Sequence, residues 1–263
     1  MNILEKIIEY KKSEVGNRKS EVSVADLRKS SLFSRPALSL KSSLQDETKT
    51  GIIAEFKRRS PSKGVINAEA DVVEVTKAYT ENGASGLSVL TDELFFGGSN
   101  DDLIKARVNK IPILRKDFII DEYQLLEAKS IGADVILLIA ACLTPAETKQ
   151  LASLAKNLGL EVLLELHDEK ELDHICDETG LVGINNRDLK TFEVDIERSL
   201  KMAEKIPSDK IKIAESGIDS IENIFLFRNH GFKGFLIGEH FMKQPDPTIA
   251  FAEFVKQLKA KAL

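Results

Sequence analysis

Short apolar strands alternate with helical segments along most of the chain, and this alternation limits the possible folds more than any other feature. From residue 51 onward, apolar runs of strand length recur, and apolar residues at helical spacing follow them. The expected strands are residues 52–57, 86–90, 112–116, 134–139, 161–165, 182–185, 211–215 and 234–237. The expected helices between them are residues 70–82, 122–130, 145–158, 169–176, 196–206, 220–229 and 247–261. This order predicts a parallel sheet, and eight units are the number that closes a (β/α)8 barrel.

An open doubly wound sheet is the alternative fold for the same alternation. Such a sheet is expected to carry a glycine-rich turn after its first strand, whereas this chain has RRSPS at residues 58–62. The length of 263 residues also suits one α/β barrel, which typically has about 250 residues. We therefore predict a single (β/α)8 TIM barrel domain over residues 1–263, with a helical N-terminal extension at 1–50 and the barrel at 51–263.

The first 50 residues are charged and rich in serine, and they lack the strand rhythm. Four apolar residues near the start share helical spacing: Ile3, Leu4, Ile7 and Ile8. They predict an amphipathic helix over residues 2–15. A second, shorter helix is expected within residues 24–32, and the polar stretch 39–50 is expected to be a loop.

Charge and cysteine content exclude several classes of protein. The formal net charge is -5, and Lys57-Arg58-Arg59 is too short a basic run for a nucleic-acid surface. No apolar run approaches the roughly 20 residues of a membrane span, and the first residues do not read as a signal peptide. Cys142 and Cys176 lie far apart, so we expect two small buried residues in a reducing, cytoplasmic protein.

Charged side chains gather where the predicted strands end. Five of them stand at or near the C-terminal ends of strands: Glu55, Lys57, Lys116, Glu165 and Glu215. Side chains alternate along a strand, so Glu55 and Lys57 share one face and Phe56 takes the other. Charges at the ends of apolar strands are costly to desolvate unless they are paired or used, and barrel enzymes place their chemistry at this end. Lysines among glutamates also suit proton exchange near neutral pH.

A phosphate site is expected beside these charges, because such barrels often bind phosphate with the loops after strands seven and eight. Those loops contain Ser216, Gly217, Gly238 and Glu239, and glycines let backbone N–H groups approach an anion. Ser60 and Lys57 are placed to reach the same anion from the first loop. We expect the Glu239 side chain to point away from the phosphate. Four apolar residues near the rim either wall an aromatic substrate or serve ordinary packing: Phe96, Phe118, Leu137 and Leu189.

Five segments resemble the indole-3-glycerol-phosphate synthase family of tryptophan biosynthesis. They are IAEFKRRSPS (53–62), LSVLTD (87–92), ILRKDF (113–118), GINNRDL (183–189) and AESGI (214–218). The resemblance covers nearly the whole chain, including the N-terminal extension. The first, third and fourth of these segments are distinctive, whereas AESGI is shared with other phosphate-binding barrels. Two departures are His240, where a small residue is common in the family, and the variable loop 93–98.

The resemblance implies an enzyme that converts 1-(2-carboxyphenylamino)-1-deoxyribulose 5-phosphate to indole-3-glycerol phosphate, CO2 and water, without a metal or organic cofactor. It implies Lys116 as the general acid for ring closure, and Glu165 and Glu55 as the carboxyl groups for dehydration. Lys57 would neutralise the substrate carboxylate and serve as a second acid.

The remaining implied roles concern orientation and binding. Asn185 and Glu215 would orient hydroxyls and the lysines, with Arg187 in support. Four residues would cradle the phosphate by backbone contacts: Ser216, Gly217, Gly238 and Glu239. The N-terminal helix would lie over the barrel mouth and exclude water. We expect a monomer that binds a phosphorylated small molecule, without nucleic acid or membrane.

Three other functions compete with this interpretation. A phosphoribosyl-amine isomerase would use a cysteine or aspartate pair, by resemblance to its known members. A Schiff-base aldolase would use Lys116 or Lys57, and a third alternative is a barrel that binds a ligand without catalysis. The four histidines have no metal-binding spacing, and we expect them on the surface or in loops: His167, His174, His230 and His240.

Overall fold

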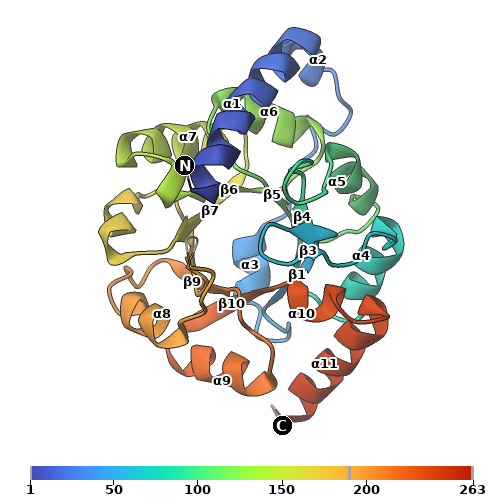
Figure 1. The fold of residues 1–263 in the computed structure, drawn as a ribbon, viewed down its shortest axis with the longest axis vertical. Coiled ribbons are helices and arrows are strands. Elements are labelled where there is room, and N and C mark those ends of the chain that lie inside the picture. Colours follow the sequence, from blue (N-terminus) through green and yellow to red (C-terminus); the bar gives the residue numbers. More distant parts are fainter. Residues whose placement is uncertain (1, 189–190, 262–263) are drawn as a thin grey trace.

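The computed structural model describes residues 2–188 and 191–261, in which eight parallel strands close into a barrel surrounded by helices (Figure 1). In order around the barrel the strands are β1 (Ile52–Phe56), β4 (Gly86–Leu90), β5 (Ile113–Lys116), β6 (Val135–Ile139), β7 (Glu161–Leu166), β8 (Leu181–Asn185), β9 (Ile211–Glu215) and β10 (Phe232–Ile237). Parallel pairing of β1 with both β4 and β10 closes the ring. The predicted (β/α)8 barrel is confirmed, and the open sheet is excluded.

Helices cover the outside of the barrel. They are α4 (Val72–Glu81), α5 (Asn100–Ala106), α6 (Glu122–Ser130), α7 (Pro145–Asn157), α8 (Ile196–Ala203), α9 (Ile221–Asn229) and α11 (Pro247–Lys261), with a short α10 (Glu239–Met242) after β10. The short helix α5 was not predicted, although its N-cap Ser99 accepts a hydrogen bond from Asp102 N. The helix predicted at 169–176 is instead a 3-10 helix, η2 (Glu169–His174). Among the described residues, no helix combines the length and apolarity needed to cross a membrane.

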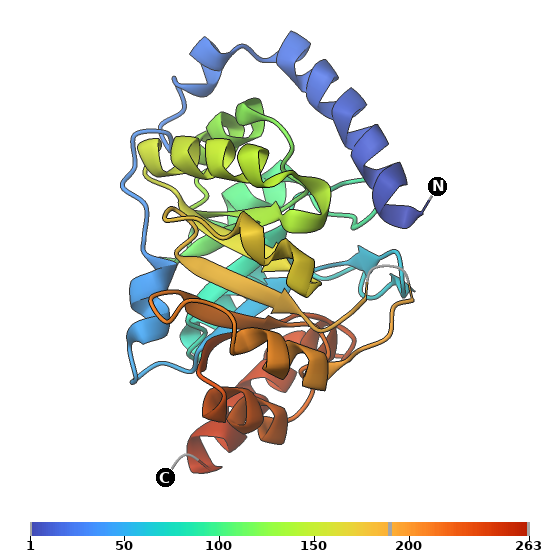
Figure 2. The same cartoon turned by 90° about the vertical axis from the view of Figure 1, so that its left-hand side faces the viewer.

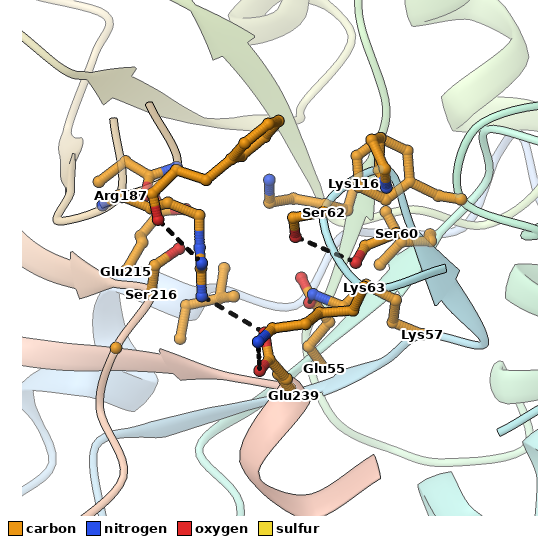
Figure 3. A pocket seen from close by; sticks show the side chains of 18 of the residues that line it. Glu55, Lys57, Ser60, Ser62, Lys63, Lys116, Arg187, Glu215, Ser216 and Glu239 are labelled. Atoms are coloured by element: carbon orange, nitrogen blue, oxygen red, sulfur yellow. Dashed lines mark hydrogen bonds and ion pairs between the residues drawn. The ribbon is translucent and has the colours of Figure 1, made fainter. Parts of the chain in front are cut away.

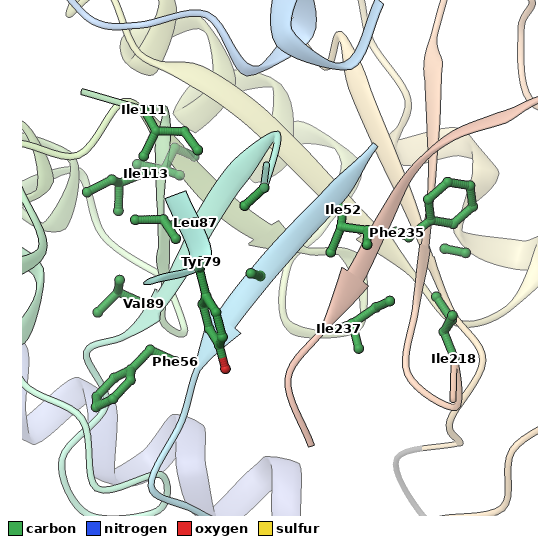
Figure 4. Packing of buried hydrophobic residues seen from close by; sticks show 14 of the residues in the cluster. Ile52, Phe56, Tyr79, Leu87, Val89, Ile111, Ile113, Ile218, Phe235 and Ile237 are labelled. Atoms are coloured by element: carbon green, nitrogen blue, oxygen red, sulfur yellow. The ribbon is translucent and has the colours of Figure 1, made fainter. Parts of the chain in front are cut away.

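Two apolar clusters lie on opposite sides of the strands, because successive side chains alternate between the two faces. The outer cluster packs strands against helices and contains Leu87, Ile113 and Phe235 together with Tyr79 of α4 (Figure 4). The inner cluster fills the barrel with Ile53, Leu114, Val135, Leu163, Ile213 and Leu236. Phe56 belongs to the outer cluster, as predicted from the alternation of β1. The core therefore leaves only the strand ends free for chemistry.

The N-terminal extension contacts both ends of the barrel (Figure 2). It contains α1 (Ile3–Glu21), α2 (Val24–Leu27) and α3 (Leu40–Gln45). Helix α1 is longer than predicted and α2 is shorter. Residues 39–50 were predicted to be a loop, which is wrong, because Leu40 and Leu44 share one face of α3 and join the inner cluster. Helix α3 thus closes the end of the barrel opposite the strand C-termini.

Helix α1 lies at the other end, along the rim of the mouth near α6 (Figure 1). Its Lys11 is fully buried, with Nζ 2.9 Å from carboxylate oxygens of both Asp92 and Asp117. Further along the helix, Arg18 forms an ion pair of 3.0 Å with Glu127 of α6. These contacts hold α1 beside the strand ends, so the predicted N-terminal helix is present, but it lies along the rim of the mouth rather than across it.

Candidate active site

A cavity of about 490 Å³ opens at the C-terminal ends of the strands and brings together most of the predicted site residues (Figure 3). The predicted residues that line it are Glu55, Lys57, Ser60, Phe96, Lys116, Phe118, Glu165, Asn185, Arg187, Glu215, Ser216, Gly217, Gly238 and Glu239. They come from seven different strands or the loops after them, so only the closed barrel assembles them. The predicted convergence of charged strand ends on one rim is confirmed.

Two predicted residues do not appear in this lining. Leu137 is 1% exposed and packs in the inner cluster, so its prediction as a wall of the cavity is wrong. Ile139, two residues further along β6 on the same face, lines the cavity instead, because it lies one layer nearer the mouth. Leu189 lies outside the described residues.

Lys116 and Glu165 form an ion pair inside the cavity, with Lys116 Nζ 3.2 Å from Glu165 Oε2. Asn185 Nδ2 donates to the other carboxylate oxygen at 3.0 Å. Burial alone would lower the pKa of Lys116. The surrounding carboxylates, led by Glu165 and then Glu215, raise it by more than burial lowers it, so the pKa lies above its ordinary value. Burial raises the pKa of Glu165, and Lys116 reverses this, leaving that pKa well below its ordinary value. The pair therefore holds a proton on the amine and a free carboxylate beside it.

Glu55 and Lys57 form a second pair, in which Lys57 Nζ lies 2.7 Å from Glu55 Oε1. Ser88 Oγ lies 3.4 Å from the other oxygen of Glu55. Glu55 also explains why residue 238 is glycine, because a Cβ there would lie 2.9 Å from Glu55 Cβ and 2.5 Å from Glu55 Oε1. Two lysine–glutamate pairs thus line one cavity, with the second at the end of β1.

Glu215 is buried and differs from the other two glutamates, because its Oε1 has no hydrogen-bond partner among the described residues. It lies over Gly183 of β8, where any Cβ would overlap the carboxylate. Burial, followed by the negative charge of Glu165, raises the pKa of Glu215 well above its ordinary value. The site therefore combines one carboxyl group whose pKa is lowered and one whose pKa is raised, both close enough to Lys116 to feel its charge.

This difference predicts the behaviour of Glu215→Gln. A carboxyl group with a raised pKa stabilises the fold while it is protonated, and this stabilisation is lost as pH rises through the folded-state pKa. Glutamine stays neutral, so the variant should match the parent below the ordinary glutamate value of 4.5 and become relatively more stable as pH rises. Urea denaturation over a pH series measures this difference. A stability difference that does not change with pH would contradict the raised pKa.

Backbone geometry beside these groups suits an anion. Ser216 and Gly217 have consecutive positive φ angles of 66° and 67°, which is an uncommon conformation for serine. Gly238 precedes the first turn of α10, whose N–H groups lack intrahelical acceptors. Three cations also line this part of the cavity: Lys63, Arg187 and Lys243. Successive outward-facing N–H groups and nearby cations are the elements from which proteins build phosphate sites.

Glu239 does not behave as predicted. Its side chain was expected to point away, but the carboxylate lies at the cavity, 3.3 Å from Arg187 Nη2 and 3.9 Å from Lys63 Nζ (Figure 3). Arg187 and Lys63 come from loops after different strands, and Glu239 sits between them. The reason is charge, since the two cations attract the only carboxylate that α10 offers.

An apolar wall faces the charged pairs. Phe96 and Phe118 lie with ring centroids 5.9 Å apart. Ile3, Leu4 and Ile7 of α1 complete the lining at the mouth. These three were predicted as the apolar stripe of a helix, yet were not assigned to the site. Lys63 was also not predicted as a site residue. It lies in the short hairpin of β2 (Arg59–Ser60) and β3 (Gly64–Val65), and these two-residue strands have no apolar pattern from which they could be predicted.

The histidines and cysteines also differ from expectation. His167 and His174 are each 8% exposed. His167 lies in the loop between β7 and η2, as predicted, whereas His174 is buried within η2, so its prediction as a surface or loop side chain is wrong. Cys142 and Cys176 are free thiols and are only partly buried. Within the described residues, no group of three or more histidine, cysteine, aspartate or glutamate side chains is arranged to hold a metal ion.

Known proteins match this chain over nearly its whole length. The family model described as indole-3-glycerol phosphate synthase matches residues 4–254. Proteins of that name from Bacteroides thetaiotaomicron and Bordetella pertussis are 48% and 43% identical to this chain over 259 residues, covering 98% and 97% of it and 99% of their own lengths. A chain of the tryptophan synthase complex from Pyrococcus furiosus, at 16% identity and a TM-score of 0.59, covers 80% of this chain and 97% of its own length, and shows the fold alone. The chain therefore belongs to the indole-3-glycerol phosphate synthase family.

Proposed function

We propose that the cavity converts 1-(2-carboxyphenylamino)-1-deoxyribulose 5-phosphate to indole-3-glycerol phosphate, CO2 and water. The observation that carries this proposal is the Lys116–Glu165 pair, held inside the barrel at 3.2 Å beside the backbone cradle at Ser216 and Gly217. The pair supplies a proton and a base, and the cradle suits a phosphate group. Family membership supplies the substrate, since relatives with 40% to 48% identity carry this enzyme's name.

The reaction needs acid at two points and base at one. Ring closure joins the carbon that carries the carboxylate to the ketone carbon, and Lys116 protonates the ketone oxygen as the bond forms. Loss of CO2 then restores the aromatic ring. In the last step the hydroxyl leaves as water while a base removes a proton from the adjacent carbon. Glu165 is available as the base, because Lys116 lowers its pKa and so favours the ionised carboxylate that can accept a proton.

The substrate is oriented by its two anionic ends. The phosphate binds at Ser216, Gly217 and the start of α10, and Arg187 and Lys63 supply positive charge there. Glu239 must release at least one of these cations, because a phosphate and a carboxylate repel each other. At the other end the aromatic ring packs against Phe96 and Phe118. Its carboxylate pairs with Lys57, which directly follows the strand that carries Glu55.

Glu55, Asn185 and Glu215 complete the set of roles. Asn185 holds Glu165 from the side away from Lys116, and so orients the base. Glu215, with its raised pKa, donates a hydrogen bond to a substrate hydroxyl or to Glu165. Glu55 transfers the proton that Lys57 needs as the second acid for dehydration, because the two groups are 2.7 Å apart. Ser60 lies in the segment after β1, a few residues beyond Lys57, and contacts the phosphate end of the substrate.

The direct test is an assay of purified protein, treated with a chelator, with the anilino-ribulose phosphate while indole absorbance and fluorescence are followed. We expect both signals to rise and to persist without metal. Absence of turnover by well-folded protein would overturn the proposal and leave the isomerase and binding-only alternatives. Borohydride trapping separates the aldolase alternative, because a stable adduct on Lys116 or Lys57 would contradict acid–base chemistry.

We also propose that the protein acts as a monomer in the cytoplasm. Free cysteines support a reducing compartment, and the cavity is lined by residues of one chain. Sedimentation of the purified protein tests the oligomeric state.

A further inference from the structure

Asn186 connects the end of β8 to the loop after β9 from behind the cavity wall. Its neighbour Asn185 lines the cavity, whereas Asn186 does not line it and is fully buried. Asn186 Nδ2 donates a hydrogen bond of 2.6 Å to the backbone carbonyl oxygen of Ser216. The amide Oδ1 has no hydrogen-bond partner among the described residues. The one hydrogen bond of this buried amide is therefore made to the residue at which the proposed phosphate cradle begins.

The backbone of Asn186 is itself held in place on both sides. Its N–H donates to the carbonyl oxygen of Glu215 at 2.8 Å, which ties it to β9. Its carbonyl oxygen accepts from the N–H of Asp195 at 2.9 Å and from Arg198 Nη2 at 3.3 Å. The amide therefore projects from a fixed point, and so it fixes the position of the Ser216 carbonyl group that it binds.

The Ser216 carbonyl group and the Gly217 N–H belong to the same peptide unit. This unit is trans and planar, so the two groups point in opposite directions. Asn186 holds the carbonyl oxygen behind the wall, and the N–H consequently faces the cavity, which Gly217 lines. Among the described residues, no group accepts a hydrogen bond from this N–H. It is therefore available as a donor to an anion.

The loop needs such support, because its backbone conformation is uncommon. Ser216 and Gly217 have φ angles of 66° and 67°, and a serine stays in this region only where its surroundings hold it there. Asn223 Nδ2 also donates to this loop, but its distance to the Gly217 carbonyl oxygen is 3.4 Å. The bond from Asn186 is the shorter of these two, and it acts on the strained serine itself.

We propose that Asn186 is a positioning residue for the phosphate cradle. By holding the Ser216 carbonyl group it keeps the Gly217 N–H aimed at the substrate phosphate, and it does so without touching the substrate. The proposal rests on the proposed function, since it concerns the same anion site. It assigns to Asn186 a share of the affinity for phosphate and no part in the acid–base chemistry.

The test is a titration of parent protein and Asn186→Asp with inorganic phosphate, in which the 15N–1H resonance of Gly217 is followed. Aspartate keeps the shape of asparagine, but its ionised carboxylate cannot donate to a carbonyl oxygen. The Gly217 resonance of the parent should shift as phosphate binds. In the variant the affinity for phosphate should fall by about 10-fold to 10²-fold, the effect of losing one hydrogen bond to a charged group.

Steady-state kinetics with the anilino-ribulose phosphate provide the second readout. In Asn186→Asp the KM should rise by a similar factor, whereas kcat at saturating substrate should change little. Asn186→Ala removes the donor without adding a charge, so it should show the same pattern and keeps the test open if the aspartate variant does not fold. A fall in kcat as large as the rise in KM would reduce Asn186 to a general structural role.

The matched control is Asn109→Asp, which changes another buried asparagine whose Nδ2 donates to a backbone carbonyl oxygen, that of Ala106 at 2.9 Å. Asn109 does not line the cavity, so this variant should keep the parent's affinity for phosphate. An equal loss in Asn109→Asp, or parental affinity in a folded Asn186 variant, would overturn the proposal. Phosphate binding by the parent without a shift of the Gly217 resonance would overturn it whatever the variants do.

The parent protein separates this proposal from the proposed function. A parent that binds phosphate but does not turn over the anilino-ribulose phosphate would count against the proposed function alone. A parent that does not bind phosphate would remove the cradle and overturn the role of Asn186 with it.

Discussion

Lys116→Met should lower kcat by at least about 10²-fold, the usual scale for a positioned general acid, with a much smaller change in KM. Methionine has a similar length and fills the same space, but it cannot protonate the ketone oxygen. The cradle at Ser216 and Gly217 does not depend on Lys116, so binding should be retained. Steady-state kinetics with the anilino-ribulose phosphate separate the two parameters, and circular dichroism checks the fold.

Two further lysine variants make this result specific. Lys57→Met removes the proposed partner of the substrate carboxylate, so it should raise KM as well as lower kcat. Lys77→Met changes a lysine of α4 that is 63% exposed and should leave both parameters unchanged. A Lys116→Met protein that keeps nearly the full rate would overturn its assignment as the acid. A loss shared equally by Lys77→Met would point to a general defect in preparation or folding.

Strand-end charges were the part of the site that the sequence could predict. Lys116, Glu165 and Glu215 each close an apolar run, and parallel strands necessarily end on the same side of a barrel. The barrel followed from the same periodicity, because a strand alternates with a helix eight times. The charged residues at these strand ends were therefore placed at the rim of the barrel without any knowledge of their contacts.

Errors arose where position depends on depth or on irregular backbone. Leu137 and Ile139 share a face of β6, and only the tilt and layering of the closed barrel decide which of them reaches the cavity. His174 was predicted on the surface or in a loop, but it is buried within η2, whose start is fixed by Asp168 and Glu171. Helix α3 was missed because a six-residue helix carries little periodicity, and its two leucines gain stability only from the barrel end they close.

The second large effect concerns the buried charges under α1. Lys11, Asp92 and Asp117 are buried, and Lys11 Nζ lies 2.9 Å from a carboxylate oxygen of each aspartate. Asp117 follows Lys116 directly in the chain, and it also contacts Arg115 at 3.1 Å. Asp92 accepts the N–H groups of Phe95 and Phe96, so it orients the loop that carries one aromatic wall. Lys11 thus links the N-terminal helix to both edges of the site.

Lys11→Met should destabilise the protein by about 3–5 kcal/mol, the usual effect of breaking a buried ion pair from one side. Asp117 keeps Arg115 and Thr91, but Asp92 Oδ2 has no other partner among the described residues. We also expect KM to rise, because a loosened α1 withdraws Ile3, Leu4 and Ile7 from the cavity mouth. Urea denaturation and steady-state kinetics measure the two effects.

The pH dependence gives this prediction its sharpest test. Despite burial, which acts in the opposite direction, Lys11 and Arg115 lower the pKa of Asp117, so their stabilisation is present above the ordinary aspartate value of 3.8 and is lost as pH falls. Burial lowers the pKa of Lys11, but Asp117 and Asp92 raise it overall, so that stabilisation is lost only as pH rises beyond 10.5. The stability gap between parent and Lys11→Met should therefore be largest between these values. Lys12→Met, on the exposed side of α1, should show no gap, and an equal effect at both lysines would contradict the buried linkage.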